Sequence, residues 1–122
     1  MRTMILILLL STFSFAGNGP SKEQLHEVLL KTLPENLCKE GTVCRECYSV
    51  NKQECKVLVS KLVTPCFNKF ENELDGNINR EKFINIADKI GSCVGDDYYA
   101  INKNQGKVDL VCYVEFQKLL DK

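Results

Sequence analysis

Apolar residues recur every three or four positions along four stretches of the chain, and polar residues fill the positions between them. This is the period of one buried helix face, whereas no stretch of useful length alternates as a half-buried strand does. The stretches begin near residues 21, 51, 79 and 107. The pattern predicts an all-α fold, a small four- to five-helix domain.

Local signals predict the bounds of the first two helices. Ser21 and Gln24 have the spacing of a capping box at a helix start. Pro34 is expected to end the first helix, because proline has no backbone N–H to donate. A second helix is expected to begin near Asn51 and to be kinked or split at Pro65, and residues 35–51 before it predict a loop.

Polar caps and glycines predict the bounds of the remaining two helices. The Asp75-Gly76-Asn77 sequence predicts the turn that ends the second helix, and Asn79 is a typical cap for the third. Gly91 and Gly95 are expected to mark the end of that third helix. Residues 94–106 then predict mostly loop, and a final helix is expected over residues 107–120.

The first residues have the three parts of a secretory signal. Arg2 is the positive start, Met4 to Leu10 form the apolar part, and Ser14-Phe15-Ala16 fits a cleavage site. The apolar run is shorter than the roughly 20 residues of a membrane-spanning helix. We therefore expect a signal peptide over residues 1–16 and a secreted single α-helical, cysteine-rich domain over 17–122. We expect this domain to be extracellular, or periplasmic if the source is a bacterium, and to have no contact with the membrane after cleavage.

The charged residues of the chain argue against two classes of partner. The 122 residues carry 16 basic and 16 acidic side chains, which gives a formal net charge of zero. A nucleic-acid-binding surface or a polybasic membrane anchor needs clustered Lys and Arg, and the chain has no such block. The sequence therefore predicts neither kind of partner.

Cysteine is the most informative residue type. The seven are Cys38, Cys44, Cys47, Cys55, Cys66, Cys93 and Cys112. In an exported chain they predict disulfides, and an odd number predicts one free thiol or a disulfide-linked dimer. Cys55 and Cys66 are eleven positions apart on one expected helix, so about 16 Å separates them and they cannot pair.

The remaining cysteines leave several pairings open. A bridge between Cys93 and Cys112 would tie the C-terminal pair of helices together, and we expect the odd cysteine among Cys38, Cys44 and Cys47. Cys44 and Cys47 form a CxxC. A redox-active pair or half of a zinc site are alternatives for it, but the context favours two structural cysteines with partners elsewhere. No cofactor is expected.

Residues 71–82 partly match a calcium-binding loop. If Gly76 takes the sixth position, Glu71, Glu73 and Asp75 take the first, third and fifth. Lys82 then stands at the twelfth position, where a glutamate should close the calcium shell. A degenerate EF-hand is therefore a lesser alternative, and a plain helix–turn–helix corner is favoured.

Signs of catalysis are few. His26 is the only histidine, it is expected to be a partly exposed helix residue, and no catalytic motif surrounds it. Asp96-Asp97 are expected in a solvated turn. Tyr98-Tyr99 offer an amphipathic contact surface. The chain is predicted not to be an enzyme.

The half of the chain from Cys66 onward resembles the insect odorant-binding proteins, which are small secreted helical carriers. The resemblance rests on Cys66, the Asp75-Gly76 turn and the late Cys112-Tyr113-Val114-Glu115. It implies bridges from Cys38 to Cys66 and from Cys93 to Cys112. It also implies a pocket lined by Leu58, Leu62, Phe70, Phe83, Ile86, Ile90, Val111 and Phe116.

Two functions remain open at this point. One is a carrier of a small apolar ligand held between the helices. The other is a protein-binding module of the inhibitor or immunity type, which would use Tyr98-Tyr99 and the 94–106 loop. An enclosed apolar cavity of a few hundred Å³ would favour the carrier, and a filled core with an exposed aromatic loop would favour the module.

Overall fold

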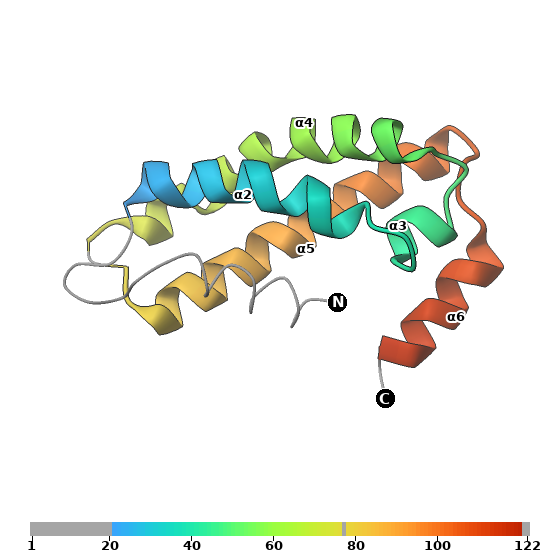
Figure 1. Cartoon of the computed structure of the whole chain (residues 1–122). Coiled ribbons are helices and arrows are strands. Elements are labelled where there is room, and N and C mark those ends of the chain that lie inside the picture. Colours follow the sequence, from blue (N-terminus) through green and yellow to red (C-terminus); the bar gives the residue numbers. More distant parts are fainter. Residues whose placement is uncertain (1–20, 77, 121–122) are drawn as a thin grey trace.

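The fold is all-α, as the sequence predicts. The computed structural model describes residues 21–76 and 78–120 (Figure 1). Within them lie five α-helices and one short 3-10 turn: α2 (Lys22–Leu37), α3 (Val43–Glu46), α4 (Lys52–Phe70), η1 (Glu71–Leu74), α5 (Arg80–Asn104) and α6 (Leu110–Leu120). The expected signal peptide, 1–16, and Asn77 of the expected turn lie outside the described residues.

Side-chain caps begin the three long helices where the sequence places them. Ser21 Oγ accepts from the N–H of Gln24 at 3.2 Å, and the Gln24 side chain accepts from the Ser21 N–H at 2.9 Å. Asn51 caps α4 through a 2.8 Å hydrogen bond in a second capping box. Asn79 caps α5 through a 2.8 Å hydrogen bond that its side chain accepts from the Lys82 N–H. These caps satisfy N–H groups that a helix start leaves free.

Pro34 does not end α2, and Pro65 does not split α4. α2 continues through Pro34 to Leu37, and α4 runs unbroken through Pro65. In α2 the buried face extends past the proline, because Leu33, Pro34 and Leu37 are all buried. Tertiary burial of this face outweighs a proline cost of about 3 kcal/mol.

The predicted loop over residues 94–106 is wrong, because it is the second half of α5. This helix has 25 residues and passes through both Gly91 and Gly95. Its buried side continues beyond Ile90 as Val94 and Tyr98 at four-residue spacing. The burial of these side chains offsets the roughly 1 kcal/mol that each glycine costs in a helix.

The core lies where α4 packs against both α2 and α5 (Figure 1). Leucines dominate the α2 side, valines the α4 side, and larger side chains the α5 side. The fully buried ones include Leu25, Leu29, Leu33, Val59, Val63, Phe83, Ile86, Ile90, Val94 and Tyr98. The three long helices therefore form the stable body of the domain.

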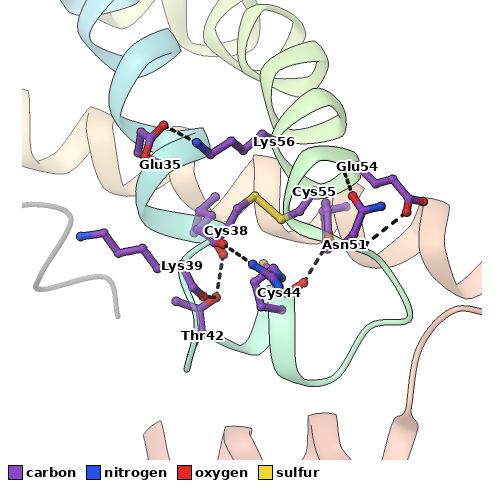
Figure 2. The surroundings of a disulfide bond; sticks show 12 residues. Glu35, Cys38, Lys39, Thr42, Cys44, Asn51, Glu54, Cys55 and Lys56 are labelled. Carbon is purple, nitrogen blue, oxygen red and sulfur yellow. Dashed lines mark hydrogen bonds and ion pairs between the residues drawn. A yellow bond between two sulfur atoms is a disulfide. The ribbon is translucent and has the colours of Figure 1, made fainter.

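Three disulfides connect the helices, and their pairing differs from the expected one. They are Cys38–Cys55, Cys47–Cys112 and Cys66–Cys93. The first joins the end of α2 to the start of α4 (Figure 2), the second joins the end of α3 to α6, and the third joins α4 to α5. The implied bridges Cys38–Cys66 and Cys93–Cys112 are wrong, because Cys66 and Cys93 face each other across the α4–α5 contact.

Two cysteine predictions are confirmed. Cys55 and Cys66 do not pair with each other, and each reaches a different helix. The odd cysteine is Cys44, one of the three candidates. It lies on α3, a single helical turn inside the segment that was expected to be a loop.

α6 lies beside α3 at one end of the bundle (Figure 1). Before it, residue Val108 forms one antiparallel bridge with Tyr48. The N–H of Ser49 donates to Lys107 O, and the N–H of Asp109 donates to Cys47 O, both at 2.8 Å. None of the helices in the described residues has the length and apolarity needed to cross a membrane.

Candidate functional site

A free thiol and a tyrosine cluster occupy the junction between α3, α5 and α6. Cys44 is only 5% exposed, and its carbonyl oxygen accepts a hydrogen bond from the Tyr98 hydroxyl at 3.1 Å. The Tyr98 ring meets the Tyr48 ring edge-on, with 4.8 Å between centroids. Tyr113 of α6 also meets the Tyr48 ring edge-on, with 6.5 Å between centroids. This cluster, Cys44 with Tyr48, Tyr98 and Tyr113, connects α6 to the core.

Burial controls the ionisation of this cluster. It raises the pKa of the Cys44 thiol to about 12. Burial also raises the pKa values of Tyr98 and Tyr113, and the nearby Cys44 raises both further. All three groups are therefore uncharged at neutral pH, and Cys44 is a poor nucleophile while the fold stays closed.

We expect the protein to lose stability in alkali partly because of Cys44. Its thiol ionises near pH 9 in the unfolded chain but only at about 12 in the folded one. The contribution of the buried Cys44 thiol to the free energy of unfolding is therefore complete below about pH 9, and it falls as the pH rises toward 12. Between about pH 9 and pH 10, urea unfolding of the wild type should lose about 1 kcal/mol more than that of Cys44→Ala. Equal losses in both proteins would contradict the assigned burial of the thiol.

The residues predicted to line a ligand pocket differ in their burial. Phe83, Ile86 and Ile90 are fully buried in the core between α4 and α5. Leu58, Leu62, Phe70 and Phe116 are half-buried against that core. Val111 faces solvent instead, so its predicted place in a pocket is wrong.

A surface depression of about 390 Å³ lies beside α4 and α5. Its charged lining residues are Lys69, Asp88, Lys89, Asp96 and Asp97, and Phe70 is its one member of the predicted pocket set. Asp97 Oδ2 lies 3.5 Å from Cys66 Sγ and 3.8 Å from Cys93 Sγ. These two sulfurs are bonded to each other, so neither offers a thiolate to a metal.

Two carboxylates of the EF-hand-like segment are paired with lysines. Asp75 forms an ion pair with Lys22 at 2.8 Å, and this pair lowers the pKa of the Asp75 carboxyl. Glu73 pairs with Lys89 at 2.6 Å. The ammonium of Lys82, at the position of the calcium-closing glutamate, donates to Asp75 O at 2.7 Å. The arrangement fits a helix–turn–helix corner.

The other singled-out side chains have packing roles. His26 is half-buried, as predicted, with its ring stacked on Phe67 at 4.7 Å and Nε2 2.9 Å from Thr64 Oγ1. Tyr98 is fully buried, so its predicted role as a contact residue is wrong. Tyr99 is half-buried and packs against Tyr113, with 4.8 Å between ring centroids. Asp96 and Asp97 lie on α5 and not in a turn.

The surface that sequence reasoning missed is on α6. Its Cys112, Tyr113 and Phe116 turn toward the domain. On its outer side four large apolar side chains face solvent, with exposed fractions of 51% for Leu110, 75% for Val111, 51% for Val114 and 66% for Leu119. We call these four residues the α6 face. Its signal in the sequence is the high density of apolar residues in 110–120, which exceeds what one buried stripe needs.

Comparison with known proteins gives one result. No curated protein and no solved structure matches the chain. A family model described as the type II secretion system (T2SS) substrate NttA matches residues 20–106, more than two thirds of the chain. The match contains α2 to α5 and five of the six bridged cysteines, and it ends before α6.

This match also corrects the resemblance drawn from the sequence. The similarity to insect odorant-binding proteins is wrong, because the family match covers most of that region and the disulfides do not follow the implied pattern. The prediction of secretion is confirmed, since the family consists of proteins that bacteria export. The chain belongs to the NttA family of secreted T2SS substrates.

Proposed function

We propose that this secreted protein is a non-enzymatic protein-binding module, and that the α6 face is its contact surface. The partner is a protein with an apolar groove that encloses α6, as in helix-in-groove recognition. The observation that carries the proposal is the exposure of Leu110, Val111, Val114 and Leu119 on one eleven-residue helix. Within the described residues Val57 is the only other large apolar side chain so exposed.

The small area of the α6 face favours binding in a partner's groove over pairing with a second copy of the chain. α6 is about 16 Å long and about 10 Å wide, so pairing two flat α6 faces buries roughly 300 Å². A stable protein interface buries about 1,200 Å² or more. A groove contacts the flanks of the helix as well as its outer face. It can also meet the ion pair of Lys118 with Glu115, 3.4 Å apart, which lies between the apolar side chains of the face.

The arrangement of the core supports a module over a ligand carrier. The residues expected to line a carrier cavity are buried in the core, as Phe83 is, half-buried against it, as Phe70 is, or exposed, as Val111 is. The 390 Å³ depression lies open at the surface among five charged side chains, whereas a carrier needs an enclosed cavity. The role of α6 replaces the Tyr98-Tyr99 surface that the sequence suggested.

Two features support a role without catalysis. The only imidazole, that of His26, is stacked on Phe67 and bound to Thr64. The only free thiol in the described residues, that of Cys44, is buried and protonated at neutral pH. Neither is placed to act as a nucleophile or general base on an external substrate.

Photo-crosslinking from α6 tests the proposal. A photoreactive amino acid replaces Val114, and the matched control carries it at Val57 on the exposed side of α4. Crosslinking is carried out in the medium into which the protein is secreted, and the captured protein is then identified and purified. We expect the purified partner to bind the wild type and to bind Val111→Asp/Val114→Asp at least about tenfold more weakly, a loss of about 1.4 kcal/mol.

The control is Val57→Asp, which should bind as the wild type does. Equal binding of the α6 double variant would overturn the proposed surface. Retention of a small apolar molecule in native mass spectra would support the carrier in its place. Binding to lipid vesicles that the double variant abolishes would point to a membrane and not to a protein.

A further inference from the structure

Three cysteines are gathered where α6 joins the domain, and only two of them are bonded. Cys47 ends α3 and is bonded to Cys112 in the first turn of α6. Cys44 lies three residues before Cys47 on the same helix and carries the free thiol. A thiol and a disulfide on one helical turn are the two reactants of thiol–disulfide exchange.

The noncovalent attachment of α6 is weak. None of the described side chains of α6 is fully buried. Two backbone hydrogen bonds precede the helix, and Tyr113 and Phe116 pack only partly against the core. Cys47–Cys112 is therefore the firmest link between α6 and the bundle.

We propose that Cys44 and the Cys47–Cys112 bridge form an internal exchange switch that releases α6. The Cys44 thiol gives its proton to solvent, and its sulfur bonds to Cys47 Sγ. The Cys47–Cys112 bond breaks, and the electron pair leaves with the Cys112 sulfur, which takes up a proton. One thiol and one disulfide are present before and after, so the step needs no oxidant or reductant.

Geometry favours Cys47 as the point of attack. Residues three apart on a helix have Cβ atoms about 5–6 Å apart, so a small adjustment at the end of α3 reaches the roughly 3.5–4.5 Å of a disulfide. The leaving sulfur is carried by a peripheral helix that is free to move away. Cys38–Cys55 is also near Cys44 (Figure 2), but it joins α2 to α4, which stay packed together, so its leaving sulfur stays close and re-forms the original bond.

The buried state of Cys44 keeps the switch closed. In the closed fold the thiol is protonated at neutral pH, and Tyr98 holds its backbone through the 3.1 Å hydrogen bond to Cys44 O. Opening of the Tyr48, Tyr98 and Tyr113 cluster admits water and restores a reactive thiol. The idea that this switch controls binding rests on the proposed role of α6. A partner that draws α6 away from the domain would expose Cys44 and favour the exchanged form.

Tryptic mapping under non-reducing conditions tests the exchange. Trypsin cleaves after Arg45, so Cys44 falls in peptide 40–45, Cys47 in 46–52 and Cys112 in 108–118. The oxidised full-length secreted protein is held at mildly alkaline pH with a low concentration of iodoacetamide and no reductant. We expect most of the label on peptide 108–118, with 40–45 disulfide-linked to 46–52.

Other labelling patterns would overturn the proposal. These are label confined to peptide 40–45, label on the Cys47, Cys38 or Cys55 peptides, or no label at all. Cys44→Ala is the control, and its peptide 108–118 should stay unlabelled, because label there would show reduction and not exchange. Hydrogen exchange of residues 110–119 should speed up in labelled wild type and not in Cys44→Ala.

This test is independent of the proposed binding function. The peptide map needs no partner and reports only which sulfur is free. The binding test uses Val111 and Val114, which take no part in the exchange. Failure of the map would therefore leave the α6 face as a contact surface, and failure of the binding test would leave the chemistry of Cys44.

Discussion

Replacement of Phe83 by alanine is expected to lower the free energy of unfolding by about 3–5 kcal/mol. The Phe83 ring is fully buried at the start of α5, among the side chains of the α4–α5 contact. Alanine removes most of its buried surface and leaves a cavity that three disulfide-linked helices cannot easily close. Thermal unfolding followed by circular dichroism should show a midpoint lower by at least about 10 °C.

Val57→Ala is the matched control for this core substitution. Val57 lies on the outer side of α4 and is 44% exposed, so its truncation should change stability by less than about 0.5 kcal/mol. A similar loss in both variants would mean that the α4–α5 contact is not the main core. It would also contradict the reading of Phe83, Ile86 and Ile90 as packing residues in place of a ligand pocket.

The second large effect concerns the Cys66–Cys93 bridge. Its removal in Cys66→Ala/Cys93→Ala should cost about 3–4 kcal/mol, the chain-entropy value for a 27-residue separation. The same model gives a larger value for Cys47–Cys112, whose cysteines are 65 residues apart. We nevertheless expect Cys47→Ala/Cys112→Ala to lower the midpoint less, because α6 can detach while α2, α4 and α5 stay folded.

Hydrogen exchange distinguishes these two kinds of loss. Without Cys47–Cys112, fast exchange should appear in residues 110–119 and spare the core of α4 and α5. Without Cys66–Cys93, protection should fall across both core helices together. If removal of Cys47–Cys112 unfolds the whole domain, α6 is an integral part of the fold and the proposed switch would destroy the protein.

The starts of the three long helices were predictable from sequence because caps are local chemistry. Ser21 with Gln24 and Asn51 with Glu54 each satisfy free N–H groups within one turn. Helix ends were not predictable in the same way. α2 passes Pro34 and α5 passes Gly95 because side chains far away in the sequence bury the next turn, and no local signal reports that burial.

In the candidate site, too, features set by nearby residues were predictable and features set by distant residues were not. That Cys44 was among the candidates for the odd thiol followed from counting and from helix geometry. The pairing of Cys47 with Cys112 did not follow, because it depends on where α6 comes to lie. That pairing also sets the rotation of α6, which turns Tyr113 inward and Val111 outward, and so it decides which apolar residues form the α6 face.

The order of the cysteines along the chain has a consequence for biosynthesis. A chain made and exported from its N-terminus presents Cys38 and Cys55 early and Cys66 and Cys93 later, so two bridges can close before the last helix emerges. Cys47 must wait for Cys112, 65 residues further on. Through that interval its nearest neighbour in sequence is Cys44. Closure of Cys47–Cys112 therefore requires that α6 has emerged, whereas the other two bridges need only the chain up to Cys93.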